Sequence, residues 1–306
     1  MKKRLKVLVT GGNGFIGSHL VDGLKKSGHD VVSYDIAGPY KNGIKQAHSS
    51  ILDYKSLCKA TKGIDVIYHL AAVSNVDEAY NNPSKCVEVN SLGTLNVLDA
   101  ARRNSVNRVI FASTVWVYTY TEETEVDENS CFSMSDEGHI YISTKIAGEL
   151  HCKDYKKLYG QDFTVLRYGI PYGERSRETT AIPIFIKNLL NGKPITIQGD
   201  GNQYRNFLYV GDLVEGNILA MKNKAKNQIY NLDGKKSTTI KELALTISNI
   251  FGQGKIIYKE ARKGEYKGKQ VSSEKARTQL GWEPKTELTC GLKKYIRWYK
   301  SKTHQS

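Results

Sequence analysis

The sequence has no uninterrupted apolar run of the roughly 18–20 residues that a membrane-spanning helix needs. Its basic start, MKKR, leads straight into a short apolar segment, so we expect no signal peptide and no membrane partner. Internal repeats and low-complexity tracts are absent as well, which argues against repeat arrays. The 306 residues therefore allow one large globular domain or two modest ones.

Cysteine is scarce and scattered. The five cysteines are odd in number and form no C-x-x-C pair: Cys58, Cys86, Cys131, Cys152 and Cys290. We therefore expect neither a disulfide framework nor a zinc or other metal site, and we expect a protein of the reducing cytoplasm. No local feature marks any of these cysteines as a nucleophile.

Acidic residues are too few to balance the basic ones, and the formal net charge is +14. Such an excess can indicate binding to nucleic acid or to an acidic membrane surface. The lysines are spread along the chain, however, and no basic run is interleaved with aromatic residues. We interpret the charge as a solvated, lysine-rich surface without a nucleic-acid partner, whose positive field would attract an anionic substrate.

Glycines gather near the N-terminus, in the segment VLVTGGNGFIG at positions 7–17. The order predicts a buried strand, a tight turn and the start of a helix. Gly11 permits the turn, Gly14 lets a pyrophosphate approach the backbone, and Gly17 lets the helix pack on the strand. A plain glycine turn is the alternative, but the context on both sides favours a dinucleotide-binding loop.

Apolar segments and helical segments alternate through the first half of the chain. Further strands are predicted at 31–35, 66–72, 108–112 and 164–168, with helices over 83–103 and from Tyr141 onward. This alternation predicts a doubly wound parallel α/β sheet with right-handed crossovers. Glycine and proline interrupt the pattern beyond Tyr168, so we expect a Rossmann domain over 1–168 and a smaller, irregular substrate lobe over 169–306, with some crossing of the chain.

Asp35 ends the second predicted strand, about twenty positions after the glycines. A carboxylate there accepts hydrogen bonds from the adenosine ribose and repels a 2′-phosphate, which favours NAD over NADP. A capping or loop aspartate is the alternative. The small Ala71 and Ala72 follow another predicted strand, where they leave room for a cofactor.

Three polar residues form the candidate catalytic group: Thr114, Tyr141 and Lys145. Tyr141 and Lys145 are four positions apart in a predicted helix, so they share one face of it. A neighbouring ammonium and a positively charged nicotinamide favour phenolate, which could then take a proton from a substrate hydroxyl as hydride leaves. Thr114 could bond the same oxygen. The polar stretch 119–138 is interpreted as a surface loop, with a lid over the site as the alternative.

These motifs resemble the extended short-chain dehydrogenase/reductase family, and within it the NAD-dependent nucleotide-sugar epimerases and dehydratases of the UDP-glucose 4-epimerase kind. The resemblance covers nearly the whole chain. It rests on TGGNGFIGSH at 10–19, HLAA at 69–72, Asn90-x-x-Gly93-Thr94, Ser113-Thr114-x-x-Val117-Tyr118, Tyr141-x-x-x-Lys145-x-x-Gly148-Glu149, the segment GDGNQYRNFLYVGD at 199–212, LGWEP at 280–284, and Trp298-Tyr299.

The resemblance implies an NAD-binding Rossmann domain and a C-terminal lobe that holds a UDP, GDP, dTDP or CDP sugar. It assigns the cofactor to Gly11, Gly14, Phe15, Ile16, Gly17, Asp35, Ile51, Leu70, Ala71, Ala72, Asn90, Tyr141, Lys145 and Tyr168. It assigns the substrate to Thr114, Tyr141, Arg205 and Arg262, the two arginines as partners of the diphosphate; surface arginines are the alternative. It also implies a homodimer through helices 83–103 and 141–159, and a place in polysaccharide biosynthesis.

The reaction is indicated by the two residues after Thr114. The related 4,6-dehydratases carry an acidic pair there, whereas this chain has Val115-Trp116, so elimination of water lacks its acid and base. We therefore expect a 4-epimerase that oxidises C4 transiently and returns hydride to the other face. A 4-ketosugar reductase or dehydrogenase is the alternative, followed by a dehydratase and by a non-catalytic NAD-binding scaffold.

The chain departs from the family pattern at several positions. Ile170 replaces a substrate-binding asparagine, Asn206 replaces an aspartate, and Ser50-Ile51 replaces an aspartate and its apolar neighbour. The residues before Tyr141 also lack the usual proline. We therefore expect a divergent member, for which the familiar UDP-galactose assignment should not be assumed.

Overall fold

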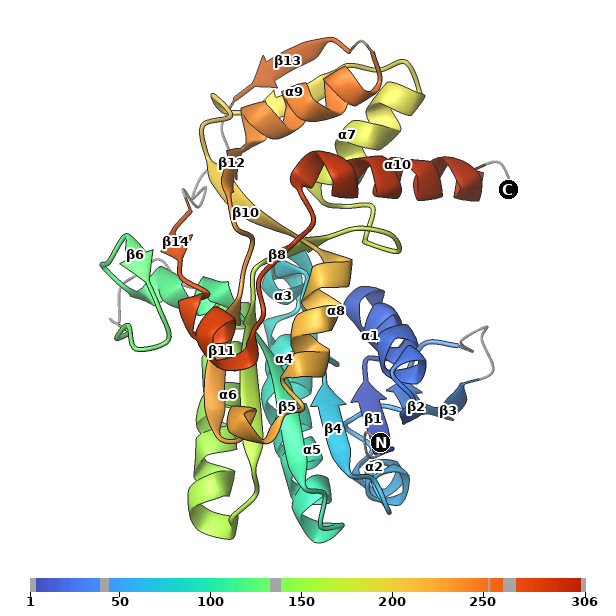
Figure 1. The fold of residues 1–306 in the computed structure, drawn as a ribbon, viewed down its shortest axis with the longest axis vertical. Helices are drawn as coiled ribbons and strands as arrows, with labels where there is room; N and C mark the ends of the chain where they lie inside the picture. Colours follow the sequence, from blue (N-terminus) through green and yellow to red (C-terminus); the bar gives the residue numbers. More distant parts are fainter. Residues whose placement is uncertain (1–3, 39–43, 133–138, 253, 261–267, 304–306) are drawn as a thin grey trace.

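The computed structural model describes residues 4–38, 44–132, 139–252, 254–260 and 268–303. Its centre is a seven-stranded sheet in the order β11-β7-β5-β4-β1-β2-β3, with every neighbouring pair parallel (Figure 1). The strands are β1 (Lys6–Thr10), β2 (Asp30–Asp35), β3 (Lys45–His48), β4 (Val66–His69), β5 (Arg108–Thr114), β7 (Phe163–Tyr168) and β11 (Gln228–Leu232). The predicted doubly wound α/β fold is confirmed.

Helices cover both faces of the sheet. Successive residues of a strand point to opposite faces, and in these strands the residues on both faces are apolar. On one face lie α1 (Phe15–Lys26) and α8 (Val210–Leu219). On the other lie α2 (Tyr54–Ala60), α5 (Gly93–Arg103) and α6 (Ile140–Tyr159). The strands β4, β5 and β7 are therefore buried along their whole length.

The helical segment predicted over 83–103 is not one continuous α-helix. It consists of α4 (Pro83–Val87), a π-helical turn (Glu88–Leu92) and α5, and a short α3 (Val76–Asn81) precedes it. Helix α6 contains the predicted Tyr141 helix and ends at Gly160, whose φ of +73° suits glycine. The π-helical turn contains Asn90, whose side chain is bonded to residues outside the turn.

The C-terminal lobe lies above the carboxyl ends of the strands in Figure 1. Its apolar core is formed by α7 (Ala181–Leu190), β9 (Ile195–Gln198), α9 (Ile240–Ile250), β13 (Ile256–Lys259) and α10 (Leu288–Thr303). A small sheet of β8 (Ile170–Tyr172), β10 (Tyr204–Tyr209) and β12 (Ser237–Thr239) connects this lobe to the main sheet. Although β11 follows β8, β9 and β10 in the chain, it returns to the main sheet beside β7. The boundary at 168/169 stays a prediction.

The loop after β5 is tied to the C-terminal part of the chain. A 3-10 helix (Val115–Tyr120) leads to β6 (Glu125–Val126), which pairs with β14 (Gln270–Val271). Lys269 Nζ also donates to the carbonyl oxygens of Thr121 and Glu123 at 2.5 and 2.7 Å. The described part of the predicted loop 119–138 is thus anchored, and residues 133–138 lie outside the described residues.

The remaining elements are short: a 3-10 turn at Asn223–Ala225 and a π-helical turn at Ala276–Leu280. None of the described helices has the length and apolarity of a membrane span.

The register brings the ends of the central strands together, because Thr10 is paired with His69, and Thr114 with Tyr168. Ligands in such sheets bind at this carboxyl edge.

Candidate active site

The glycine loop between β1 and α1 has the geometry that its sequence predicts. Gly11 has a φ of +69°, and a Cβ there would lie 2.8 Å from the backbone nitrogen of Ala71. A Cβ on Gly17 would lie 2.0 Å from the carbonyl oxygen of Gly11, so helix α1 can approach the loop only with glycine there. Gly14 caps α1 and is exposed, which leaves the first N–H groups of the helix accessible to phosphate.

Asp35 lies beside this loop at the end of β2. Its Oδ2 accepts a hydrogen bond from the Asn13 backbone at 2.9 Å, and its Oδ1 accepts one from Ala37 at the same distance. Both bonds hold the carboxylate at the carboxyl edge of the sheet, half-buried, where a ribose could reach it. In the first turn of α1, Ile16 packs on the core, and Phe15 meets His19 edge-on.

The predicted floor of the cofactor site follows β4. Leu70, Ala71 and Ala72 are half-buried, and the Ala71 N–H donates to Thr10 Oγ1 at 3.2 Å. Ile51 is buried under Gly93, where a Cβ would lie 2.5 Å from Ile51 Cδ1. These small and apolar groups leave room for a cofactor next to Gly11.

Two predicted cofactor residues have structural partners of their own. The Tyr168 hydroxyl donates to Asn217 Oδ1 at 2.6 Å within the core. The Asn90 amide accepts from the Val73 backbone at 2.8 Å and donates to Thr144 Oγ1 at 3.0 Å. Asn90 thereby fastens the loop after β4 to the helix that carries Tyr141. Cofactor contacts of both residues stay predictions.

Thr114, Tyr141 and Lys145 come together as the sequence predicts. Tyr141 and Thr114 share a hydrogen bond, and the Lys145 Nζ lies 5.9 Å from the centre of the Tyr141 ring. Lys145 Nζ donates to the Ala112 carbonyl oxygen of β5 at 2.8 Å, which fixes its position. All three side chains are buried at the carboxyl edge. Tyr141 and Lys145 are one turn apart in α6, and Thr114 is the last residue of β5.

The pKa of Tyr141 is governed by burial. Burial raises the pKa of this phenol to about 12, while the Arg177 charge and the Thr114 hydrogen bond act to lower it. Burial also lowers the pKa of the Lys145 ammonium to about 8. The sequence predicts a lysine-lowered tyrosine pKa, but in the chain alone desolvation outweighs the nearby charges. A positive nicotinamide would act in the same direction as Arg177.

Three residues around Tyr141 were not predicted as site residues from the sequence. His139 stacks on the Tyr141 ring with centres 6.0 Å apart, and Trp116 meets the same ring edge-on at 6.3 Å. Arg177, from the loop after β8, donates to the Ser74 hydroxyl and acts electrostatically on Tyr141. No local sequence motif marks them, because their approach to Tyr141 depends on packing between distant segments.

Arg205, one of the two predicted diphosphate partners, lies in β10 on the side of the C-terminal lobe. Arg205 Nη1 donates to the Tyr204 carbonyl oxygen at 2.7 Å and lines a small hollow of about 20 Å³ with Trp116 and Ile170. Arg262 lies outside the described residues. The substrate-binding roles of both arginines stay predictions.

The replacement of an aspartate by Asn206 has a physical reason. Asn206 Nδ2 donates to Asp233 Oδ2 at 2.7 Å, and burial raises the pKa of Asp233 to about 7. An aspartate at position 206 would bring two carboxyl groups into contact at a buried place. Asp233 lines the same hollow as Arg205 and was not predicted from the sequence.

The fold and the Thr114–Tyr141–Lys145 site define a Rossmann-type enzyme that uses a nicotinamide cofactor. Residues 7–233 match the NAD dependent epimerase/dehydratase family, and the chain belongs to this family. The predicted resemblance is thereby confirmed.

Similar proteins cover nearly the whole chain. A Methanocaldococcus jannaschii protein that carries the provisional name UDP-glucose 4-epimerase is 36% identical, over 96% of this chain and 98% of its own. The Thermotoga maritima UDP-glucose 4-epimerase with UDP-glucose has a TM-score of 0.91 at 30% identity, covering 98% of this chain and 100% of its own. The Bacillus cereus UDP-glucuronic acid 4-epimerase with UDP-glucuronic acid and NAD has a TM-score of 0.88 at 31% identity, covering 97% and 99%.

Proteins named as UDP-uronate decarboxylases also match. The epimerases nevertheless confirm the predicted NAD cofactor and the predicted activity of an NAD-dependent nucleotide-sugar epimerase.

Proposed function

We propose that the chain is a UDP-sugar 4-epimerase whose reaction is carried by Thr114, Tyr141 and Lys145. The observation that carries the proposal is their convergence at the carboxyl edge of the sheet that also carries the glycine loop, with the apolar Val115 and Trp116 in the place of the dehydratase acids. Such a site can move a proton and a hydride at one carbon, but it has no carboxylate after Thr114 for elimination. UDP is proposed because the similar proteins are named for UDP sugars.

The cofactor site fits the dinucleotide. The N–H groups at the start of α1 would hold the pyrophosphate across Gly14, and the Asp35 carboxylate would hold the adenosine ribose. NAD supplies a hydride acceptor when bound. The close packing at Gly11 and Gly17 keeps the loop close to the sheet, so the pyrophosphate can approach its backbone.

The chain's own residues handle the proton. Tyr141 would take it from the C4 hydroxyl through its phenol oxygen and later give it back, while Thr114 would bond the same sugar oxygen. Lys145, held by the Ala112 carbonyl oxygen, would place positive charge near the phenol. Arg205 would pair with the diphosphate, and Arg262 is proposed as its second partner.

A product assay decides this proposal. Purified protein is incubated with UDP-glucose, UDP-N-acetylglucosamine and UDP-glucuronate, and the C4 epimers are separated while absorbance at 340 nm is followed. We expect one epimer and no net NADH. Stoichiometric NADH would instead identify a dehydrogenase, and binding of NAD without turnover would identify a scaffold.

The first prediction concerns Tyr141→Phe. The variant lacks the phenol oxygen, so turnover should fall at least about 10²-fold, the lower bound for general acid–base catalysis. NAD binding, measured by calorimetry, should stay within a few-fold of wild type. Activity that survived the substitution would remove Tyr141 from the mechanism.

We further propose a cytoplasmic homodimer that supplies sugars for polysaccharide biosynthesis. Support for the dimer comes from apolar side chains left exposed on the outer side of α6 and of the π-helical turn that packs against it. Leu92 and Leu150 are 50% and 52% exposed. Exposed leucines on adjacent helices are typical of an interface.

A further inference from the structure

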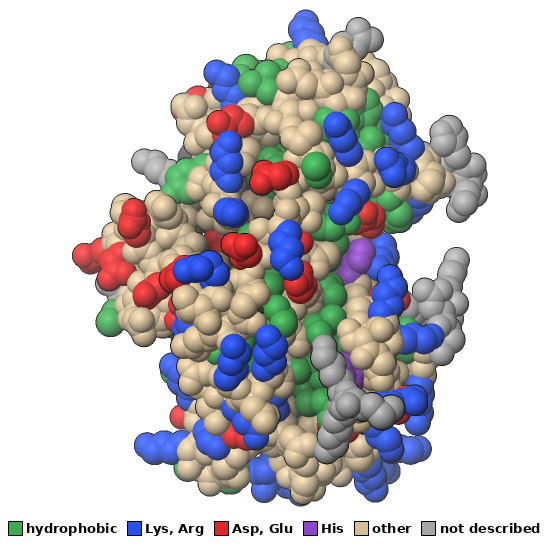
Figure 2. Space-filling view, in the orientation of Figure 1, with side chains coloured by type: hydrophobic (Ala, Val, Ile, Leu, Met, Phe, Trp, Pro, Cys, Tyr) green, Lys and Arg blue, Asp and Glu red, His purple; other side chains and the backbone are tan. Residues whose placement is uncertain are grey.

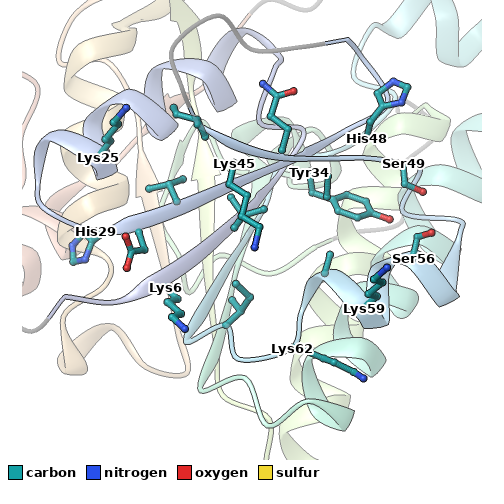
Figure 3. A pocket seen from close by; sticks show the side chains of 18 of the residues that line it. Lys6, Lys25, His29, Tyr34, Lys45, His48, Ser49, Ser56, Lys59 and Lys62 are labelled. Carbon is teal, nitrogen blue, oxygen red and sulfur yellow. The ribbon is translucent and has the colours of Figure 1, made fainter.

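A groove of about 980 Å³ lies at the β3 edge of the sheet, between that strand and α2. Figure 3 shows it with side chains from both walls turned toward the hollow. Among the residues that the structure describes, none of those assigned to cofactor or substrate lines it. The groove is therefore a feature separate from the active site.

The rim of the groove is basic. Lys45 comes from β3, Lys59 from α2, and Lys62 from the turn after α2; all three are exposed (Figure 3). Within the described parts of the chain, no salt bridge engages any of these three lysines. Asp30 is the acidic residue among those that line the groove, and it pairs with Arg4.

The floor of the groove is aliphatic and only partly covered. Val32 of β2 and Ala47 of β3 remain half-buried, whereas the central strands are fully buried. The hydroxyls of Tyr34 and Ser56 already donate to Ser50 and Asp53. A surface with flexible ammonium groups and an apolar floor suits carboxylates on a protein segment better than a small molecule that needs fixed hydrogen bonds.

The same chain carries such an acidic segment at the other end of the sheet. Glu122, Glu123 and Glu125 are exposed on the loop that contains β6. The loop is fixed by the β6–β14 pairing, and the Asn231 N–H of β11 donates to Glu128 Oε1 at 2.6 Å. Figure 2 shows acidic side chains gathered on this projection, on the side opposite β3 in Figure 1.

We propose that the acidic loop of one copy, Glu122 to Glu125, docks into the basic groove of a second copy. The loop lies beyond β11 and the groove beside β3, at opposite edges of one sheet, so a single chain cannot bring them together. The contact is therefore head-to-tail, and it leaves a free loop and a free groove at the ends of the pair.

The net charge of +14 opposes association at long range. At physiological ionic strength the screening length is about 8 Å, so charges within the contact outweigh the rest of the surface. Three glutamates against three lysines then attract. The same screening makes the contact weaken at high salt.

Sedimentation equilibrium across a range of concentrations tests the proposal with charge-exchange variants. Wild type should gain average mass with concentration at about 0.15 M salt, near physiological ionic strength, and lose that gain at about 1 M. The groove variant K45E/K59E/K62E and the loop variant E122K/E123K/E125K should each associate at least about tenfold more weakly, given exposed pairs of modest strength. An equimolar mixture of the two variants should associate again, because the exchanged charges match.

The matched control is K241E/K255E/K293E, which makes the same change in net charge at exposed lysines of the C-terminal lobe. It should associate like wild type, and circular dichroism and sugar-nucleotide turnover should be unchanged in all variants. A mass independent of concentration, a mixture that stays dissociated, or a control that dissociates equally would overturn the proposal. Binding of poly-glutamate or RNA in the groove, without binding of a second copy, would also overturn the proposal, in favour of another occupant.

Discussion

At the scale of single residues, the proposed chemistry depends on how strongly the protein opposes ionisation of Tyr141. Burial holds the pKa of its phenol at about 12, and Arg177 is the charged group that acts to lower it. Arg177 reaches Tyr141 from the loop after β8, and its contact with Ser74 fixes it between the two lobes. A residue outside the recognisable sequence motifs thus bears on the proposed proton transfer.

Arg177→Ala should therefore raise the pKa of Tyr141 further, because a positive charge favours phenolate and its removal favours the neutral phenol. The rising limb of kcat/KM against pH should move to higher pH, with a several-fold loss of activity at pH 7. Arg177→Lys is the matched control and should keep the wild-type profile. A profile that stays in place for the alanine variant would contradict the electrostatic role.

At the scale of elements, α6 is held on the sheet by a buried ion pair. Arg167 of β7 donates to both carboxylate oxygens of Glu149 at 2.9 and 2.7 Å, and Ser113 of β5 donates to the same carboxylate. Arg167 also donates to the Tyr118 hydroxyl at 2.8 Å. Helix α6 carries Tyr141 and Lys145, so this network sets their position relative to Thr114.

Arg167→Ala should lower the free energy of unfolding by about 3–5 kcal/mol, because it leaves the Glu149 carboxylate buried without its partner. Urea denaturation monitored by circular dichroism measures this. Lys85→Ala, which breaks the exposed pair with Glu88, is the control and should have little effect. Equal effects of the two substitutions would show that the buried pair contributes no special stability.

At the scale of the whole molecule, two surfaces of different chemistry are available for assembly. The outer side of α6 and its neighbouring π-helical turn exposes Leu150 and Leu92, whereas the β3 edge and the β6 loop are oppositely charged. Salt weakens charged contacts and leaves apolar ones in place. The proposed helix-mediated dimer and the head-to-tail contact can therefore be separated experimentally.

The double variant L92E/L150E should convert the dimer to a monomer, because association would bury two carboxylates without partners. Light scattering after size-exclusion chromatography at high salt measures the mass. Leu245→Glu, at a leucine of α9 that is 44% exposed, is the control and should remain dimeric. A dimer that persists in the double variant would place the interface elsewhere.

The sequence by itself determined the features that depend on neighbouring positions. A strand, turn and helix within eleven residues define the glycine loop, and a four-residue spacing puts Tyr141 and Lys145 on one helix face. Alternating strand and helix segments determine the fold class, since parallel strands require crossovers. The predicted ribose-binding role of Asp35 follows from its place at the end of such a strand.

Only the tertiary structure decided what depends on contacts between distant segments. Packing brings Arg177, Trp116 and His139 to Tyr141, and it buries Asp233 against Asn206. The return of β11 to the sheet and the groove beside β3 likewise depend on how distant segments pack. Burial, which raises the pKa of Tyr141, is a property of the whole fold rather than of any motif.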